Sequence, residues 1–314
     1  MRRAFGLADW PADVRGPVLA LGTFDGIHLG HRRVLGLAVD RARARGGPSA
    51  ALTFEPHPLE VLRPAHEPVL LSTVDERLEQ FEALGIDVGL VLPFDDAFSK
   101  IAAAAWLDGV LRGRLDAREI VAGSSYTFGF RREGTARRLE AWGRAADVPV
   151  HLVPAVLAGG EPVSSSRIRA ALREGLVEDA ARLLGRCYRL AGRIVPGAGR
   201  GRTIGVPTAN LATPPRKIVP AHGVYATVAS VRGRRYRGAT NIGTRPTFGG
   251  AGVTVETFLL DFEGDCTGDE MVLEFVRYLR GERAFPDAGA LTRQIAQDVA
   301  AVRELPGEEE AGIM

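Results

Sequence analysis

A glycine-rich segment, Gly22–His31, separates two apolar patterns near the start of the chain. The run before it, Pro17–Leu21, has the length of a short buried strand, whereas apolar residues in Arg32–Arg45 recur with an approximately helical period. Glycines at such a junction let the backbone approach a ligand closely. The free N–H groups at the helix start then favour phosphate. The segment therefore predicts a strand, a phosphate-binding loop and a helix, in that order.

Two histidines give this loop a chemical role. His28 and His31 are three residues apart, so both would lie on one face of the first helical turn. Imidazoles beside a phosphate cradle indicate charge stabilisation on a nucleoside triphosphate. We expect Gly22, Gly26 and Gly30 to supply the close backbone approach.

The first part of the chain continues the alternation of strand and helix. Strands are expected at Val18–Gly22, Ala50–Phe54, Val88–Leu92, Ile120–Gly123 and Val150–Val153. Helices are expected at Arg32–Arg45, Val74–Leu84, Ala97–Leu111 and Thr135–Ala146. Ser72 is expected to cap the second helix, because Asp75 and Glu76 follow it. Such alternation predicts a parallel sheet covered on both faces, with ligands beyond the carboxyl ends of its strands.

The pattern changes near Cys187. Two helices are expected before it, at Ser166–Glu174 and Val177–Leu184, and one near the end of the chain, at Ala288–Val302. Between them, β-branched alternating runs occur at Val224–Val231, Val253–Asp261 and Met271–Leu279. We therefore expect two domains, residues 1–186 and residues 187–314. The expected fold class is α/β then mostly β: a Rossmann-like parallel-sheet domain, followed by a small closed β-barrel with a terminal helix.

Composition excludes several functions. The net charge is +2, and the one basic concentration, Arg232–Arg237, is interpreted as a solvated hairpin turn, so nucleic acid is not an expected partner. Lys100 and Lys217 are the two lysines, and neither follows glycine, which excludes a Walker A loop. The segment Gly197–Arg202 lacks the third glycine of the dinucleotide fingerprint.

Cysteine content and hydropathy bear on the compartment. Cys187 and Cys266 are too few for a disulfide framework or a zinc site. The residues Met1–Leu7 do not lead into a secretory signal, and no apolar stretch is long enough to span a bilayer. We expect a cytoplasmic protein without a membrane partner, as a monomer or weak homo-oligomer.

Two further motifs follow predicted strands of the first domain. His57 lies between Pro56 and Pro58, which rigidify the loop around it. It is either a ligand-binding residue or a satisfied loop histidine. The loop after Ile120–Gly123 contains Tyr126, Phe128 and Phe130, which suit either a planar ligand or the packing of the loop itself.

A serine-rich segment opens the helix after the fifth strand. Ser164, Ser165 and Ser166 could cap their own helix or hydrogen-bond a phosphate, and Arg169 could add a bidentate contact. The capping alternative is the common one for serines taken alone. All four motifs follow predicted strands, however, which favours one shared site.

The second domain contains three polar motifs. Thr208 and Asn210 offer neutral oxygen ligands at alternate positions, as Mg²⁺ can use when phosphates supply the remaining charge. Asn241–Phe248 is a second turn-rich segment. Glu256 lies within an apolar strand, where a carboxylate is either an ion-paired structural acid or a general base.

Together these residues resemble the bacterial bifunctional riboflavin kinase/FAD synthetase family, from about Pro17 to Val302 and in that family's domain order. Gly22–His31 is similar to its HxGH region, and Ser164–Arg169 to its serine-rich nucleotide motif. Gly205–Asn210 is similar to its flavokinase PTAN segment. An HxGH motif alone indicates a nucleotidyltransferase, whereas the PTAN segment together with Asn241–Phe248 is much more specific.

The resemblance implies two reactions. The first domain would transfer AMP from ATP to FMN, giving FAD and pyrophosphate. The second would transfer the γ-phosphate of ATP to the 5′-hydroxyl of riboflavin, giving FMN. The substrates would then be ATP, riboflavin and FMN, with Mg²⁺ as cofactor.

The resemblance also implies catalytic and binding residues. His28 and His31 would stabilise charge on the ATP phosphates in either protonation state, near the ordinary pKa of about 6.5. Glu256 would take the proton of the riboflavin hydroxyl, while Thr208 and the catalytic Asn210 would hold Mg²⁺ and phosphate. The nucleotide-binding residues would be Gly22, Phe24, Asp25, Gly30, Ser164, Ser165, Ser166, Arg169, Gly199 and Gly205. The flavin-binding residues would be His57, Ser125, Tyr126, Phe128, Arg280 and Phe285.

Three places depart from the family's pattern. Ser125 stands where Asp or Asn is usual, and its shorter side chain would weaken a contact to flavin or phosphate. Cys266-Thr267-Gly268 replaces a more usual Leu-Tyr-Gly, and Ala284 replaces a common lysine. The last two changes are not expected to abolish the kinase chemistry.

There are two alternatives to the two-activity enzyme. The chain could keep only its flavokinase, with the first domain a weak or inactive nucleotide-binding scaffold, as Ser125 suggests. It could also be a non-catalytic flavin sensor. Binding alone needs neither a base such as Glu256 nor a phosphate clamp such as His28 and His31, so the sensor is disfavoured.

Overall fold

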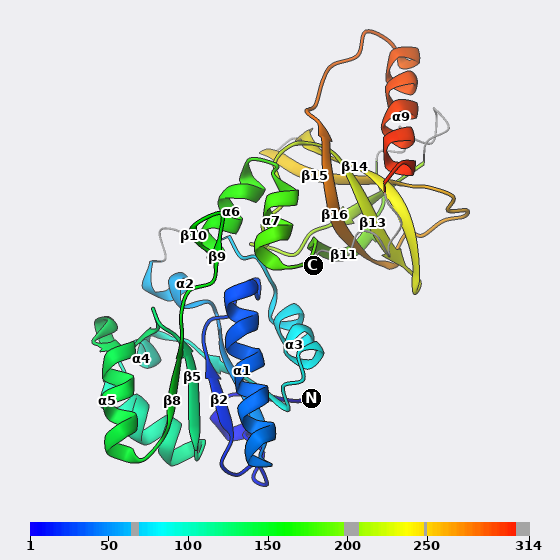
Figure 1. Ribbon diagram of the computed structural model, residues 1–314. Coiled ribbons are helices and arrows are strands. Elements are labelled where there is room, and N and C mark those ends of the chain that lie inside the picture. Colours follow the sequence, from blue (N-terminus) through cyan, green and yellow to red (C-terminus); the bar gives the residue numbers. More distant parts are fainter. Residues whose placement is uncertain (64–68, 198–206, 248–249, 306–314) are drawn as a thin grey trace. The chain divides into compact units, whose positions relative to one another are not determined.

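The chain divides into two compact units, Met1–Ser165 and Ser166–Met314 (Figure 1). The computed structural model describes residues 1–63, 69–197, 207–247 and 250–305. The division falls before Cys187, where the sequence pattern changes, because helices α6 (Ser165–Arg173) and α7 (Val177–Leu184) belong mainly to the second unit.

A six-stranded parallel sheet organises the first unit, in the order β1-β4-β3-β2-β5-β8. Its strands are β1 (Arg2–Phe5), β2 (Val18–Leu21), β3 (Ser49–Glu55), β4 (Val88–Pro93), β5 (Glu119–Gly123) and β8 (Val150–Val153). Strands β2, β3, β4, β5 and β8 confirm the sequence prediction. The edge strand β1, which pairs with β4, escaped it because two of its residues are arginines. Two small hairpins lie in the loops, β6 (Thr127–Phe128) with β7 (Gly134–Thr135) and β9 (Leu157–Ala158) with β10 (Glu161–Pro162).

Helices cover both faces of this sheet, as predicted. They are α1 (Leu29–Arg45), α2 (Pro58–Leu62), α3 (Val74–Ala83), α4 (Asp96–Ser99), the π-helix η2 (Ala105–Arg114) and α5 (Ala136–Ala146), with 3₁₀ turns η1 (Leu7–Asp9) and η3 (Phe130–Arg132). Side chains alternate across a strand, so each face buries its own cluster. Leu35 of α1 and Leu78 of α3 pack on one face, and Trp106 of η2 and Leu139 of α5 pack on the other.

The helix predicted at Ala97–Leu111 is wrong as a single element. The structure has α4, a break, and then η2. At the break, the carbonyl of Ile101 accepts a hydrogen bond from the Phe130 N–H at 2.7 Å, and the Ala103 N–H donates to the Glu133 carboxylate at 2.5 Å. The loop that contains Phe130 and Glu133 therefore forms hydrogen bonds with backbone groups that would otherwise bond within a continuous helix.

The cap predicted for α3 is also displaced by one residue. The side chain of Thr73, not that of Ser72, accepts from the Glu76 N–H, and Glu76 returns a bond to the Thr73 N–H. This is a complete capping box. Ser72 is left for a different contact, described below.

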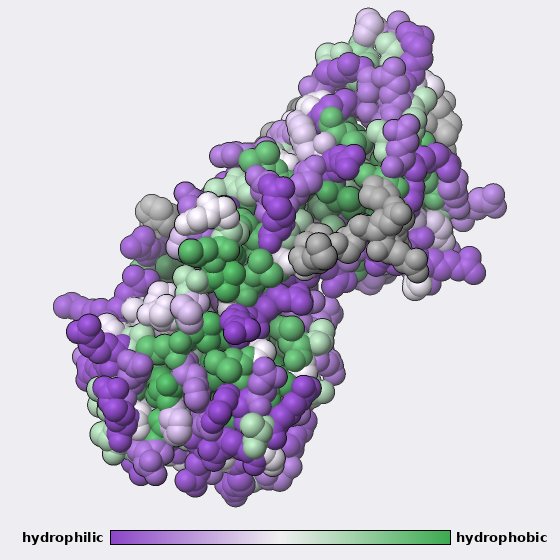
Figure 2. Space-filling view, in the orientation of Figure 1, coloured by the Kyte–Doolittle hydropathy of each residue, from purple (hydrophilic) through white to green (hydrophobic). Residues whose placement is uncertain are grey.

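A closed antiparallel barrel forms the second unit, in the order β11-β12-β15-β14-β13-β16 (Figure 1). Its strands are β11 (Tyr188–Val195), β12 (Thr208–Ala212), β13 (Gly223–Val231), β14 (Arg234–Thr247), β15 (Gly250–Leu259) and β16 (Glu270–Arg280). Closure leaves no free edge, in agreement with the sequence prediction. The terminal helix α9 (Ala288–Arg303) packs outside the barrel, where Val302 meets Ala226 and Leu260. Its outward surface is largely hydrophilic (Figure 2).

Three barrel strands were missing from the sequence prediction: β11, β12 and β14. The segment Asn241–Phe248 was interpreted as turn-rich, yet Asn241–Thr247 lies in β14, and Phe248 is outside the described residues. Glycine, threonine and arginine interrupt the alternation of apolar and polar residues in β14. Its hydrogen bonds to β13 and β15 hold it in the barrel. The basic hairpin was predicted correctly at its turn, where Arg232 and Gly233 both have positive φ.

Candidate active sites

The ligand edge of the parallel sheet is set by its strand order. β3 and β4 lie on one side of β2, whereas β5 lies on the other, so the order reverses between β2 and β5. Open α/β sheets bind ligands at such a switch point, beyond the carboxyl ends of the strands. The loop Gly22–His28 leaves β2 here, and the loop that begins at Gly123 leaves the neighbouring β5.

The loop from β2 to α1 turns sharply at three residues. φ is 51° at Phe24, 82° at Gly26 and 40° at Ile27. Left-handed backbone at a residue with a side chain costs about 1–2 kcal/mol. Phe24 and Ile27 are fully buried, so packing holds both in this conformation.

Asp25 ties this loop to the segment before α3. Its buried carboxylate accepts hydrogen bonds from the N–H groups of Leu71 and Ser72 and from the Ser72 hydroxyl, at 3.0–3.2 Å. The Ser72 hydroxyl in turn accepts from the Gly26 N–H at 2.8 Å. The Ser165 hydroxyl donates to the carbonyl of Asp25 at 2.9 Å. Asp25 therefore fixes the shape of the loop from within the protein.

The two histidines of the loop are stacked. The ring centroids of His28 and His31 are 3.7 Å apart, at an interplanar angle of 15°. His28 is the N-cap of α1, and its Nδ1 accepts from the His31 N–H at 3.3 Å, so its neutral ring carries the proton on Nε2. A Cβ at Gly30 would lie 3.1 Å from the His28 ring, which explains the glycine between them.

The surroundings of His31 keep its ring neutral. Burial lowers the pKa of His31 well below 6.5, and the neighbouring His28 lowers it further. Of the two protonation states that the sequence left open for His31, these surroundings favour the neutral one. Within the described part of the chain, the buried Nδ1 of His31 has no hydrogen-bond partner.

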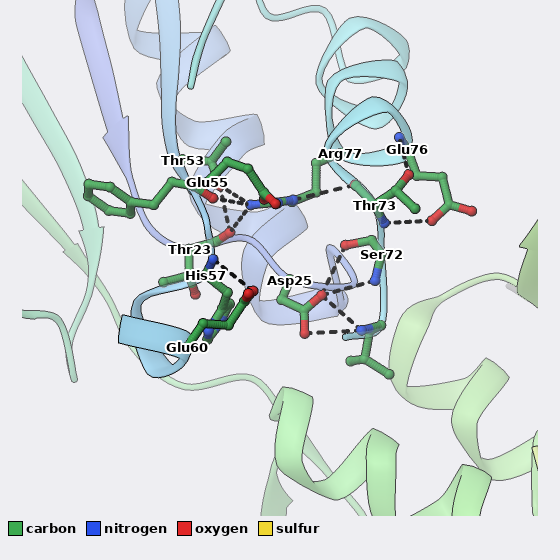
Figure 3. A network of polar contacts seen from close by, with 12 residues as sticks. Thr23, Asp25, Thr53, Glu55, His57, Glu60, Ser72, Thr73, Glu76 and Arg77 are labelled. Atoms are coloured by element: carbon green, nitrogen blue, oxygen red, sulfur yellow. Dashed lines mark hydrogen bonds and ion pairs between the residues drawn. The ribbon is translucent and has the colours of Figure 1, made fainter. Parts of the chain in front are cut away.

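Arg77, which the sequence analysis missed, holds the carboxyl ends of β2 and β3 together (Figure 3). This residue of α3 is 1% exposed. Its Nη1 donates to the carbonyl of Thr23, the hydroxyl of Thr53 and the carbonyl of Phe54, at 3.3, 2.7 and 2.9 Å. Its Nη2 donates to the Glu55 carboxylate at 2.8 Å. The sequence feature that could have identified Arg77 is its position between Thr73 and Phe81, on the apolar face of α3.

His57 caps helix α2. Its Nδ1 accepts from the Leu59 N–H at 3.2 Å, while the Glu60 carboxylate accepts from the His57 N–H at 3.0 Å. The peptide bond between Glu55 and Pro56 is cis. His57 thus lies at the carboxyl end of β3, as predicted, with one ring nitrogen engaged in the structure of its own loop.

The aromatic loop after β5 packs largely into the core. Phe128 is buried in the cluster that contains Trp106, and Tyr126 packs against the same cluster in a stacked contact with Phe128. Burial raises the pKa of the Tyr126 hydroxyl, so it remains protonated. Ser125 is exposed, and so is the ring of Phe130.

The serine-rich segment spans the division between the units. Ser164 and Ser165 belong to the first unit, and Ser165 opens α6. Ser166 and Arg169 lie further along α6, in the second unit.

The barrel brings the predicted kinase residues side by side. Asn210 of β12 lies directly opposite Glu256 of β15, which lies opposite Asn241 of β14. Thr208 lies two residues before Asn210 and therefore on the same face. A Cβ at Gly197 would lie 2.2 Å from the amide nitrogen of Asn210, so the backbone there approaches this side chain closely. Gly199 and Gly205 lie outside the described residues.

Arg280 is engaged with the terminal helix. It donates two hydrogen bonds to the Asp298 carboxylate of α9, at 3.0 and 2.7 Å. Its guanidinium lies over the ring of the half-buried Phe285. These two predicted flavin residues are therefore brought together, in a contact that anchors the end of β16 on α9.

Two properties of the described residues bear on metals and membranes. No helix among residues 1–63, 69–197, 207–247 and 250–305 is long and apolar enough to cross a bilayer. Within these same ranges, no cluster of three or more His, Cys, Asp or Glu side chains has the arrangement of a metal site.

Comparison with known proteins identifies both units. Residues 11–167 match the sequence model of the FAD synthetase family, and residues 184–305 match that of riboflavin kinase. The bifunctional riboflavin kinase/FMN adenylyltransferase of Bacillus subtilis is 38% identical over 287 residues, which cover 90% of each chain. The enzyme of that name from Escherichia coli K12 is 34% identical over 297 residues, 94% of this chain and 95% of its own.

A solved structure supports the architecture of the whole chain. The crystal structure of a protein from Streptococcus pneumoniae described as a macrolide-efflux protein aligns with a TM-score of 0.90 and 30% identity, over 98% of this chain and 100% of that one. This likeness concerns the fold. Because the models of both families match and curated relatives align along most of their length, the chain belongs to the bifunctional riboflavin kinase/FMN adenylyltransferase family.

Proposed function

We propose that the chain performs its two reactions at two separate places, one in each unit. It phosphorylates riboflavin to FMN with ATP and adenylylates FMN to FAD with release of pyrophosphate. We assign adenylyl transfer to the loop Gly22–His31 and phosphorylation to the outer face of β12 and β15. The observation that carries this assignment is the pairing of Asn210 with Glu256 in the barrel, whereas the histidine loop belongs to the other unit. The proposed functional boundaries are residues 1–186 and 187–314.

Adenylyl transfer begins with attack of an FMN phosphate oxygen on the α-phosphorus of ATP. Pyrophosphate leaves, and negative charge develops on the phosphate oxygens. The stacked imidazoles of His28 and His31 lie at the helix start where these oxygens would be held, and the neutral ring of His31 can donate or accept a hydrogen bond there. The protein contributes positioning and electrostatics, with little covalent work.

Asp25 acts in this proposal by shaping the loop, since its carboxylate already accepts three hydrogen bonds from Ser72 and Leu71. Ser164, Ser165, Ser166 and Arg169 are proposed to complete the nucleotide site. His57, Ser125, Tyr126 and Phe128 are proposed to line its flavin side.

In the barrel, Glu256 is proposed to take the proton of the riboflavin 5′-hydroxyl as its oxygen attacks the γ-phosphorus of ATP, with ADP as the leaving group. Thr208 and Asn210 fit a hard cation, because both offer neutral oxygens on the face where the Glu256 carboxylate lies. Mg²⁺ held there would neutralise charge on the phosphates. Arg280 and Phe285 are proposed to bound the flavin side of this site.

The proposed setting is a cytoplasmic monomer or weak homo-oligomer acting on small molecules. Cys187 and Cys266 are free thiols, which suits a reducing compartment.

Two matched substitutions test the assignment of the two sites. Purified full-length protein is incubated with riboflavin, ATP and Mg²⁺, and the flavins are separated by chromatography. We expect His28→Ala to stop the sequence at FMN. We expect Asn210→Ala to block FMN formation while supplied FMN is still converted to FAD. Loss of both steps in either folded variant would show that the two reactions share one site.

A further inference from the structure

The guanidinium of Arg77 is buried, and its N–H groups donate to the loop that follows β2 and to strand β3. Besides the Thr23, Thr53, Phe54 and Glu55 contacts, its Nε donates to the carbonyl of Thr73 at 3.4 Å. Removing a guanidinium from water is costly unless its donors are satisfied, and here acceptors surround it. Its planar fork of donors suits several acceptors at fixed directions, unlike an ammonium group.

The contact with Thr23 sets the direction of the next amide. The carbonyl of Thr23 accepts from Arg77 and, at 2.7 Å, from the Thr53 hydroxyl. A trans peptide is planar, so the C=O of Thr23 and the N–H of Phe24 point in opposite directions. The N–H of Phe24 therefore points away from Arg77. Among the described residues it has no hydrogen-bond acceptor.

The same helix reaches the histidines through a second contact. The ring of Phe24 meets Phe81 of α3 edge-on at 5.4 Å and His31 edge-on at 5.3 Å. A Cβ at Gly22 would lie 3.0 Å from the Phe24 ring, so the start of the loop is packed directly on this residue. α3 thus supports both the backbone and the aromatic core of the loop.

We propose that Arg77 is a positioning residue for adenylyl transfer, which holds the Thr23–Phe24 peptide so that the Phe24 N–H faces the ATP phosphates. Arg77 does not touch substrate and acts through the loop. The proposal rests on the assignment of adenylyl transfer to this loop. It extends that assignment to a buried cation on a neighbouring helix.

The test uses full-length protein with FMN, ATP and Mg²⁺, and measures kcat and the KM for ATP in FAD formation. Arg77→Met is expected to lower kcat/KM for ATP roughly ten- to hundredfold, as misplacement of a binding group does. The greater part should be a rise in KM for ATP, because the amide binds phosphate in the ground state as well. The KM for FMN and the riboflavin kinase activity of the same chain should stay within twofold.

Lysine and valine substitutions separate positioning from charge and folding. Arg77→Lys keeps the charge but loses the fork, so it is expected to resemble Arg77→Met. Thr53→Val removes a milder part of the same network and is expected to raise the KM for ATP roughly three- to tenfold, as loss of one hydrogen bond does. If Arg77→Met does not fold, the Thr53→Val variant tests the proposal in its place.

The matched control is Leu78→Ala, at the next residue of α3. Leu78 is fully buried, so its truncation destabilises the same unit, but it makes no hydrogen bond to the loop. The proposal is overturned if Leu78→Ala raises the KM for ATP as much as Arg77→Met does. An unchanged KM for ATP in folded Arg77→Met and Thr53→Val would also overturn it. His28→Ala, assayed in parallel, tests the site assignment itself, since retained FAD formation there would reject the assignment whatever Arg77 does.

Discussion

His31 shows how the surroundings of one side chain set its protonation state. Burial and the adjacent His28 keep its ring neutral, while the Phe24 ring holds it edge-on. Under the proposed assignment, the neutral ring acts on the phosphates as a hydrogen-bonding group rather than as a counter-charge.

The depressed pKa of His31 predicts a specific dependence of stability on pH. The unfolded chain binds a proton at His31 near pH 6.5, whereas the folded chain binds it only at clearly lower pH. Stability from His31 is therefore constant above about pH 6.5 and is lost as pH falls below it. We expect the difference in unfolding free energy between the parent and His31→Gln to shrink by about 1 kcal/mol from pH 7.5 to 5.5. Denaturant titrations at the two pH values measure it, and a constant difference would contradict a neutral His31 in the folded chain.

Helix α1 is anchored at its far end by an ion-pair network that is remote from the ligand edge. Glu119, the first residue of β5, accepts hydrogen bonds from Arg41 and Arg45 of α1 and contacts His151 at 2.8 Å. Burial raises the pKa of Glu119, but these partners outweigh it and lower the pKa to about 2. The network fixes α1, and hence the histidines at its start, against the sheet.

This network predicts an acid-sensitive contribution to the stability of the first unit. Because the folded pKa of Glu119 is depressed, its contribution is complete above about pH 4.5 and is lost as pH falls towards about 2. Arg41→Met is expected to lower the unfolding free energy at pH 7, although only in part, since Arg45 and His151 remain as partners of Glu119. The loss should be smaller at pH 3, because the parent protein has by then lost part of the stabilisation that the ionised Glu119 provides. Urea titrations at both pH values test this, with the exposed Arg33→Met as the control.

The molecule as a whole consists of two units, to which we assign separate chemistry, and helices α6 and α7 belong mostly with the barrel. α7 packs on β16 and β11, where the N–H of Tyr278 donates to the carboxylate of Glu178 at 3.4 Å. The carbonyl of Leu172 in α6 accepts from the Ala221 N–H at 2.9 Å. The two helices therefore contribute to the stability of the barrel although they precede its first strand.

A pair of truncations tests this organisation. A fragment of residues 166–314 keeps α7, whereas residues 187–314 lack it and expose the barrel surface that α7 covers. α7 buries Val177, Leu183 and Leu184 among others, and each large apolar side chain buried contributes about 1.5–3 kcal/mol. We expect the longer fragment to have the clearly higher Tm by calorimetry. Equal Tm values would place the structural boundary at Cys187 instead.

Much of the fold could be predicted from local patterns, and the failures have physical causes. The apolar runs of β2, β3 and β4 are visible because a parallel sheet buries both of their faces. β14 is hidden because glycine and arginine fill it and its stability comes from two neighbouring strands. The helix expected at Ala97–Leu111 fails because a distant loop captures backbone groups at Ile101 and Ala103.

By itself the sequence determined the family motifs and the residues proposed for the chemistry: His28, His31, Asn210 and Glu256 belong to motifs that local spacing makes visible. Tertiary structure alone decided what holds them. Arg77 and Ser72 are far from Thr23 and Asp25 along the chain, and their contacts form only when α3 packs beside β2 and β3. Local propensity cannot encode such contacts, because they depend on the register and direction of elements that meet only in the folded sheet.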